Sequence, residues 1–260
     1  MRDLQSLASS LAVPGVHAVA VSEPSKSHFG GSPNLPSSTD WPEWHDRKLG
    51  FLARISLPDL QRVRRIDWLP TDGALLFFYD VDEQPWGFDP KHRGGCAVLH
   101  VPDLESPAMA ATNTDELFPQ VGINFRFIET LPSTERPEVE VLSLSDQEFD
   151  EYWKLRDAAF QGLPKHQLTG LPTPVQGDYM ELECQLVSNG VYCGDSSGYN
   201  GPRAKELEGG ASDWRLLLQL DTDDDAGVMW GDCGTLYFWV QAQDAAEGRF
   251  ENAWLILQCS

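Results

Sequence analysis

The densest group of potential ligand atoms in this chain is the stretch DTDDDAGVMWGD, residues 221–232, which carries five aspartates. Carboxylates at alternate loop positions suit Ca²⁺, and the EF-hand loop uses positions 1, 3, 5 and 12 with Gly at position 6. Counted from Asp221, Asp223 and Asp225 fit this spacing, but position 6 is Ala226 and position 12 is Asp232 instead of Glu. The flanking runs LLLQL and GTLYFWV indicate strands rather than helices. An EF-hand is therefore not expected.

Three alternatives remain for this acidic loop (residues 221–232). It can be a solvated turn whose Asp side chains accept hydrogen bonds from nearby backbone N–H groups. It can present negative charge to a basic partner. It can also be a weak Ca²⁺ or Mg²⁺ site, although no metal is our primary expectation. The candidate ligands in that case are Asp221, Asp223, Asp225 and Asp232.

We expect the acidic loop to join two neighbouring strands, with Asp221 and Asp232 near its base. Residues 223–225 should point mostly to solvent, while residues 228–229 should turn back toward the core. Trp230 is either an exposed recognition aromatic or, as is more usual for Trp, a cover for the core edge. The candidate partner-binding residues are Asp221, Asp223, Asp224, Asp225, Trp230 and Asp232.

Other reactive side chains are scattered along the chain. None of the six His residues stands in a G-x-S-x-G or H-E-x-x-H motif, and no Gly-rich phosphate loop occurs. Cys193 and Cys233 have no identifiable His partner in the sequence. We therefore predict no catalytic residue and no cofactor.

Composition limits the class of protein. The 40 acidic and 19 basic side chains give a formal net charge of −21, which repels nucleic acid and anionic membrane and favours a basic protein partner. The five Cys residues are odd in number and lack C-x-x-C spacing, as expected in a reducing compartment. No apolar run approaches the roughly 20 residues of a membrane span, and the N-terminus is a poor signal peptide. We expect a cytoplasmic protein.

Apolar patterning predicts an α+β fold with mixed, mostly antiparallel sheets and a few helices. Helices are expected at 2–12, 146–160 and 179–189, and capping boxes are expected at Ser145 with Glu148 and at Asp178 with Glu181. Strands are expected at 49–57, 73–81, 95–101, 123–129, 138–142, 216–220 and 234–240.

A weak internal repeat divides the chain. Aligning Gly73 with Gly234 pairs Leu75 with Leu236, and the same alignment pairs Phe77 with Phe238 and Phe78 with Trp239. We expect an N-terminal segment, 1–28, and a single domain, 29–260, with two repeated β units at about 45–130 and 175–260. Short loops between the strands favour antiparallel pairing within each unit.

The segments FLARISLPDL (51–60), LPTDGALLFFYD (69–80), MWGDCGTLYFWV (229–240) and four others occur in order along the chain. Together they resemble the YwqG-like bacterial family of unknown function, over roughly residues 29 to 260. The resemblance implies an α+β fold with a duplicated layout, a bacterial cytoplasmic setting and, from the gene neighbourhoods of some members, toxin immunity. It implies no activity and no catalytic residue. The motifs are FGGSPNLPSSTDWP (29–42), FLARISLPDL (51–60), LPTDGALLFFYD (69–80), MELECQLVSNGVYCGD (180–195), LLLQLDTDDD (216–225), MWGDCGTLYFWV (229–240) and NAWLILQCS (252–260).

Two functional hypotheses follow. The first is a non-enzymatic, acidic protein-binding module, in its most concrete form an immunity protein that neutralises a basic toxin. The alternative is an enzyme that acts on a small molecule in a cleft between the duplicated halves. In that case ordered loops carrying Trp41, Trp44 and Trp86 would build an aromatic pocket.

Overall fold

The protein is described here from a computed structural model that covers residues 3–36, 39–101 and 118–260. Within these residues, ten strands form one antiparallel sheet in the order β12-β11-β10-β9-β1-β8-β2-β5-β6-β7, and β3 pairs with β4 in a separate hairpin. The predicted α+β class and antiparallel pairing are confirmed. The strands are β1 (Val13–Val21), β2 (Ser27–Phe29), β3 (Glu43–Trp44), β4 (Arg47–Lys48), β5 (Gly50–Ser56), β6 (Ala74–Tyr79), β7 (Cys96–Val101), β8 (Val121–Thr130), β9 (Gln167–Leu168), β10 (Trp214–Asp221), β11 (Thr235–Gln241) and β12 (Trp254–Gln258).

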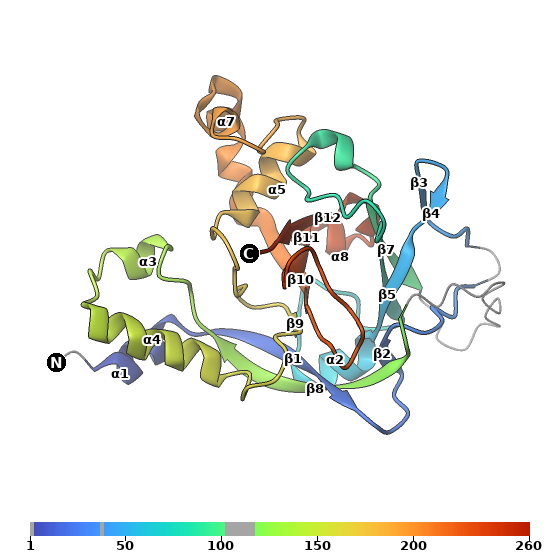
Figure 1. Ribbon diagram of the computed structural model, residues 1–260, viewed down its shortest axis with the longest axis horizontal. Helices are drawn as coiled ribbons and strands as arrows, with labels where there is room; N and C mark the ends of the chain where they lie inside the picture. The colour runs from blue at the N-terminus through green and yellow to red at the C-terminus, as the bar shows by residue number, and fades with distance from the viewer. Residues whose placement is uncertain (1–2, 37–38, 102–117) are drawn as a thin grey trace.

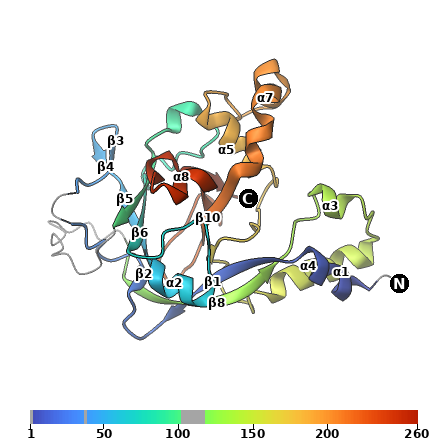
Figure 2. The same cartoon turned by 180° about the vertical axis from the view of Figure 1, so that it is seen from behind.

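Helices are short and surround the sheet. No helix in the described ranges has the length and apolar character that crossing a membrane requires. Helix α2 lies against β5 and β8, on the side seen in Figure 2. The α-helices are α1 (Leu4–Leu11), α2 (Leu57–Val63), α3 (Pro137–Glu140), α4 (Asp146–Ala158), α5 (Met180–Ser188), α6 (Ser197–Asn200), α7 (Pro202–Leu207) and α8 (Ala242–Ala246), and the 3₁₀ helices are η1 (Pro90–His92), η2 (Glu208–Asp213) and η3 (Phe250–Asn252).

The centre of the sheet is the long antiparallel pair β1 and β8, which pairs Val13 with Thr130 at one end and Val21 with Gly122 at the other. In Figure 1 this pair runs to one side of the molecule, where α1, α3 and α4 lie. The expected N-terminal segment, 1–28, thus supplies the middle strand of the sheet, with Val16 and Ala18 in the core.

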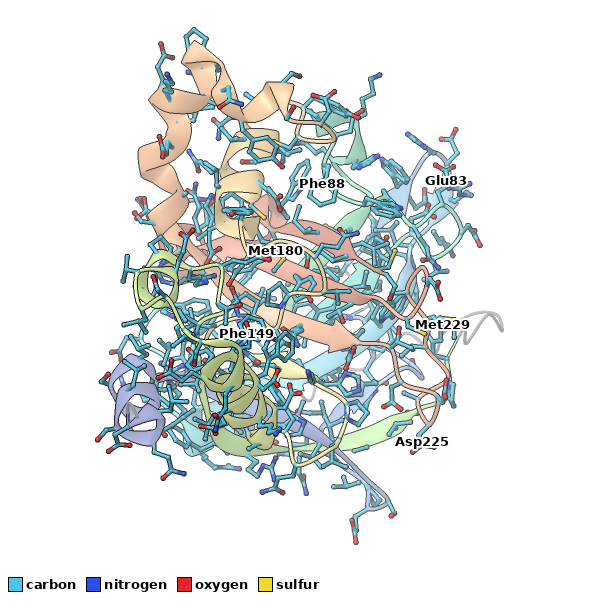
Figure 3. The ribbon with its side chains drawn as sticks, turned by 60° about the vertical axis from the view of Figure 1, so that its left-hand side comes forward. Glu83, Phe88, Phe149, Met180, Asp225 and Met229 are labelled. Atoms are coloured by element: carbon cyan, nitrogen blue, oxygen red, sulfur yellow. The ribbon has the colours of Figure 1, made fainter. Side chains whose placement is uncertain are left out.

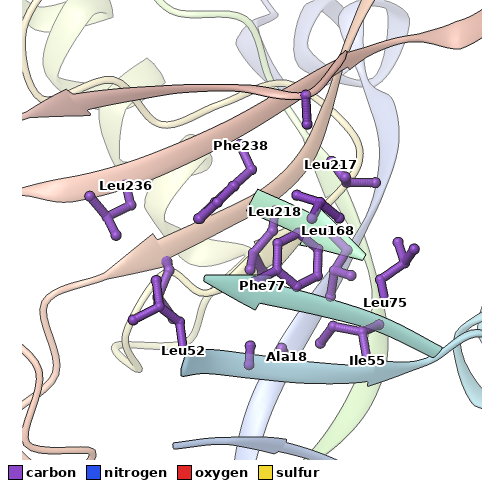
Figure 4. Close-up of a cluster of buried hydrophobic side chains, with 14 of the residues drawn as sticks. Ala18, Leu52, Ile55, Leu75, Phe77, Leu168, Leu217, Leu218, Leu236 and Phe238 are labelled. Carbon is purple, nitrogen blue, oxygen red and sulfur yellow. The ribbon is translucent and has the colours of Figure 1, made fainter. Parts of the chain in front are cut away.

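The two ends of the sheet match each other in register. Strand β5 pairs with β6 through a bulge between Phe51 and Ala53, and β10 pairs with β11 through a bulge between Leu216 and Leu218. The sheet curls so that these ends face each other, nearly as in a barrel. Phe77 of β6 and Phe238 of β11 then meet edge to face with ring centroids 5.2 Å apart (Figure 4).

Most predicted elements are present. The strands expected at 49–57, 73–81, 95–101, 123–129, 216–220 and 234–240 correspond to β5, β6, β7, β8, β10 and β11. The capping box at Ser145 begins α4 as predicted. The strand expected at 138–142 is wrong, because Pro137 begins the short helix α3 there.

Helix α5 is present where expected, but its predicted capping box is wrong. Tyr179 is the N-cap, and no side chain caps the helix. Asp178 instead receives two hydrogen bonds from Arg136, at 2.6 and 2.7 Å. A charge-assisted, bidentate pair is stronger than a single cap hydrogen bond, so Asp178 turns away from the helix.

Candidate functional site

The acidic loop joins β10 to β11, as predicted, and Asp221 fixes its base. The Asp221 carboxylate accepts from the Thr235 hydroxyl of β11 and from the Lys165 backbone N–H, each at 2.9 Å. At the other end, the backbone carbonyl of Asp232 accepts from the N–H of Ser260 at 3.2 Å. Both ends of the loop are therefore attached to the sheet.

Asp223 is buried, contrary to the expectation that it points to solvent. It is 6% exposed, and its Oδ2 lies 3.0 Å from Nε2 of the buried His166. The other ring nitrogen, Nδ1, accepts from the backbone N–H of Asp221 at 3.2 Å, so a neutral imidazole carries its proton on Nε2 and donates it to Asp223. This hydrogen bond lowers the pKa of Asp223 and keeps its carboxylate ionised.

Side chains alternate between core and solvent in the second half of the acidic loop. Asp223 and Val228 form an antiparallel bridge through two backbone hydrogen bonds of 3.0 Å, which imposes the alternation of a strand. Val228 turns inward as expected. Met229 does not, because the alternation leaves it 53% exposed.

Trp230 lies in the core. It is fully buried and packs edge-on against Tyr79 and Phe118, with centroid distances of 6.1 and 5.8 Å. Of the two interpretations of this residue, the structure matches the core residue and leaves no surface for recognition. Its burial fixes the acidic loop to the hydrophobic cluster beneath it.

The exposed part of the acidic loop joins a second acidic loop. The backbone N–H of Gly231 donates to Oε1 of Gln84 at 2.9 Å, which places the end of the acidic loop beside the loop that carries Gln84. Figure 3 shows Glu83, Met229 and Asp225 along one edge of the molecule. We call this surface the acidic face; its exposed residues are Asp82, Glu83, Trp86, Asp224, Asp225, Met229 and Asp232.

Charges on the acidic face are largely unneutralised. Arg47 binds Glu83 at 2.8 Å and the neighbouring Asp80 at 2.7 Å. The described residues place no cationic group within ion-pair distance of Asp224, Asp225 or Asp232. These three carboxylates therefore face solvent with their charge available to a partner.

The candidate cation site is not assembled. Within the described ranges, no three His, Cys, Asp or Glu side chains are positioned to hold a metal ion. Asp221 and Asp223 use their oxygens on protein donors, while Asp225 and Asp232 lie on the exposed side of the loop. The sequence spacing suggested a convergence that the bridge between Asp223 and Val228 prevents.

Two of the three tryptophans expected in a cleft between the halves line a different pocket, whose described walls all come from residues 44–92 of the first half. Trp44 and Trp86 line a pocket of about 540 Å³ together with His45, Glu83 and His92. Trp41 is not among its lining residues, because it packs on the cluster around Phe78 and donates its indole N–H to the Leu49 carbonyl at 2.8 Å. The pocket opens beside the acidic face, through the shared residues Glu83 and Trp86.

Thiol chemistry finds no support in the geometry around Cys193. Burial raises the pKa of Cys193 to about 12, so the thiol stays protonated and a weak nucleophile at neutral pH. Nearby, burial raises the pKa of Glu183 to about 7, although a hydrogen bond from the Tyr199 hydroxyl at 3.0 Å opposes the change. No local sequence pattern predicts this buried carboxyl, because side chains from other segments, such as Tyr199, form its environment.

A cleft of about 700 Å³ lies between residues of the first half of the chain and residues of the second. Its described lining includes Arg64 and Trp68 from the first half of the chain and Asp178, Glu181 and Trp239 from the second, with no His or Cys. A cleft between the halves was part of the enzyme hypothesis. The described lining also contains the hydroxyls of Thr169, Tyr179 and Ser212, and its charged and aromatic side chains suit it to bind a ligand.

Comparison with known proteins gives a family and no function. No curated protein matches the chain. One family model, described as a domain of unknown function (DUF1963), matches residues 27–259. This match covers β2 to β12, and therefore includes the acidic loop, the aromatic pocket and most of the cleft. The chain belongs to this DUF1963 family.

Proposed function

We propose that this protein binds a basic protein partner through the acidic face. The observation that carries the proposal is the group of exposed, unneutralised carboxylates at Asp224, Asp225 and Asp232, on a face that also exposes Met229 and Trp86. The net charge of −21 extends this field over the whole molecule. Complementary charge of this kind accelerates association with a basic surface.

Two apolar side chains supply anchors within the charged rim. Met229 is 53% exposed and Trp86 is 43% exposed, and Trp and Met are enriched at protein interfaces. A large side chain held among charges can carry most of the binding energy, while the surrounding carboxylates set the association rate. We therefore expect Met229 and Trp86 to determine the affinity for the partner, and the aspartates to determine the association rate.

The acidic face is held rigid before any partner binds. The hydrogen bond between His166 and Asp223, the buried Trp230 and the contact between Gly231 and Gln84 each fix one part of the acidic loop. A surface that is already ordered loses less conformational entropy on binding. The concrete form of this function is immunity, in which the partner is a basic toxin.

Affinity capture from the native host tests the proposal. Immobilised protein should retain a basic protein at low salt and release it at high salt, since screening weakens exposed charges. The variant D224N/D225N/D232N should lose this partner. The control E138Q/D150N/E208Q changes the net charge equally at exposed sites elsewhere and should keep it. Equal loss in both variants, or no basic partner at any salt concentration, would contradict the proposal.

We also infer that the two halves of the chain arose by duplication. The alignment of Phe77 with Phe238 and of Phe78 with Trp239 is supported by register, because Phe78 pairs with Phe51 where Trp239 pairs with Leu216. The order of strands is consistent with it: β1 and β8 lie at the centre, followed outward by β9, β10, β11 and β12 on one side and by β2, β5, β6 and β7 on the other. Alignments of many family members, one half against the other, should recover this correspondence; a random offset would contradict it.

A further inference from the structure

The cleft between the halves differs in chemistry from the acidic face. Strand β1 contributes Pro14, the turn after β9 contributes Gly170, and α3, α5 and β10 close the other sides. The volume of about 700 Å³ is within the usual range of small-molecule sites, which is about 300–1,000 Å³.

Three arginines line this cleft, and only one of them is neutralised. Arg136 binds Asp178 through two hydrogen bonds and Glu181 through a third, at 2.7 Å. Arg64 donates to the Thr169 hydroxyl at 2.8 Å, and Arg215 donates to backbone carbonyls. The described residues place no carboxylate within ion-pair distance of Arg64 or Arg215.

Arg64 is the better placed of the two free cations. It is half-buried, and burial lowers its pKa from the ordinary value, while the charge of Asp67 opposes this change from beyond ion-pair distance. Its charge is therefore partly desolvated and has no directly paired carboxylate among the described residues. One donor of its guanidinium is used on Thr169, which fixes the orientation of the others. An anion bound in the cleft could pair with the planar guanidinium of Arg64 and accept several of its hydrogen bonds.

The remaining walls are aromatic, and one of them has an unused donor. Trp68 and Tyr179 line the cleft, and Tyr179 is 54% exposed. Trp239 also lines it; this residue is 1% exposed, yet its indole Nε1 has no hydrogen-bond partner. Buried polar groups are nearly always paired. Because Trp230 Nε1 in the core is unpaired as well, it is the place of Trp239 in the cleft wall that makes its Nε1 a candidate donor to a ligand.

We propose that this cleft binds a small organic anion with a flat, apolar body. Its anionic group pairs with Arg64, Arg215 adds to the attraction, and the body packs on the aromatic walls. An oxygen of the ligand accepts from Trp239 Nε1. The proposal is independent of the protein partner, because it concerns other residues. The net charge of −21 repels anions, so any preference for an anionic ligand must come from the residues of the cleft itself.

Three small probes that differ in charge or in the presence of an aromatic ring test which ligand chemistry the cleft prefers. 2-Naphthoate should bind with a dissociation constant of about 1 mM or tighter, the value expected for a ligand of this size. 2-Naphthylmethylammonium and acetate should bind at least tenfold more weakly, the first for its charge and the second for its missing ring. Binding is followed in ¹H–¹⁵N spectra, where the indole signal of Trp239, identified with Trp239→Phe, should shift.

Variants locate the site. Arg64→Gln should weaken 2-naphthoate binding at least tenfold, since a charge-assisted hydrogen bond contributes that much. Arg62→Gln, on the same helix and paired with Asp59 at the surface, should change binding less than twofold. Arg64→Lys keeps the charge and should give an intermediate loss, which separates a lost cation from a misfolded variant. Equal binding by Arg64→Gln and wild type, a preference for the cationic probe, or an unshifted Trp239 signal would each overturn the proposal.

Discussion

At the scale of single residues, the clearest difference between prediction and structure concerns a pair of buried ionisable side chains. His166 and Asp223 illustrate what sequence alone can and cannot predict. The spacing of the aspartates was visible, but the partner of Asp223 lies 57 residues away along the chain. Only the pairing of β9 with β1 and β10 brings His166 under the acidic loop. A contact between distant segments has no local signal, so Asp223 was assigned to solvent.

The buried Glu183 leads to a prediction about pH. Its pKa is raised to about 7 in the folded protein, whereas an unfolded chain titrates near the ordinary value of about 4.3. Between these values the folded state binds the extra proton, so the free energy of unfolding of wild type falls as pH rises. Glu183→Gln keeps the shape without titrating. Its stability relative to wild type should increase by about 3 kcal/mol between pH 4 and pH 8.

Urea unfolding at several pH values measures this difference. The control is Glu208→Gln, which changes an exposed carboxylate and should follow the wild-type profile at all pH values. Parallel profiles for Glu183→Gln and wild type would show that Glu183 is not protonated on folding.

At the scale of elements, hydrophobic periodicity predicted the strands and helices that have local sequence signals. It failed for elements whose structure depends on contacts with distant segments. The strands β5, β6, β10 and β11 are short apolar runs, and α4 begins with a local capping box, so both signals are local. Strand β1 was missed because Pro14, Gly15 and His17 interrupt its apolar pattern. Its stability comes from β8 and β9 on either side. Likewise, the cleft arginines come from three separate segments, which no motif connects.

The acidic loop behaves as an element whose anchor is Asp223. Asp223→Ala removes the acceptor of the buried His166 N–H and should lower the free energy of unfolding by about 2–3 kcal/mol at pH 7. The neighbouring Asp224→Ala, at an exposed position, should change it by less than about 0.5 kcal/mol. Because the pKa of Asp223 is lowered on folding, its contribution is present above the unfolded pKa and is lost as pH falls through the folded one.

Chemical unfolding at pH 7 and at pH 3 distinguishes this anchor from a simple packing effect. The difference between Asp223→Ala and wild type should shrink in acid. Hydrogen exchange should also quicken for residues 224–230 in Asp223→Ala at pH 7, because the bridge with Val228 opens. A difference that is unchanged by pH would contradict the role of the carboxylate.

At the scale of the whole molecule, the dominant feature is the formal net charge of −21, which exceeds the few carboxylates that the fold holds in buried pairs such as that of Asp178 with Arg136. The core is a continuous apolar cluster inside the curled sheet, and the exposed carboxylates of the acidic face make few internal contacts. Like charges on a compact surface repel one another and destabilise it. A surface that reduces stability is commonly one that is retained for function.

Salt should therefore stabilise this protein. Between about 10 mM and 300 mM NaCl the Debye length falls from roughly 30 Å to below 10 Å, so repulsion among the surface carboxylates is screened and the melting temperature should rise. In a domain of this size about 1 kcal/mol of relief corresponds to roughly 2–4 °C. The variant D224N/D225N/D232N should have a higher melting temperature than wild type at low salt, and its melting temperature should rise less with added salt.

The control E138Q/D150N/E208Q removes the same number of charges away from the acidic face. If repulsion is concentrated on the acidic face, the melting temperature of the control at low salt should rise less than that of D224N/D225N/D232N. A melting temperature that falls with salt would show that attractive ion pairs, such as that of Arg136 with Asp178, outweigh the repulsion, and that the acidic face is not maintained against stability.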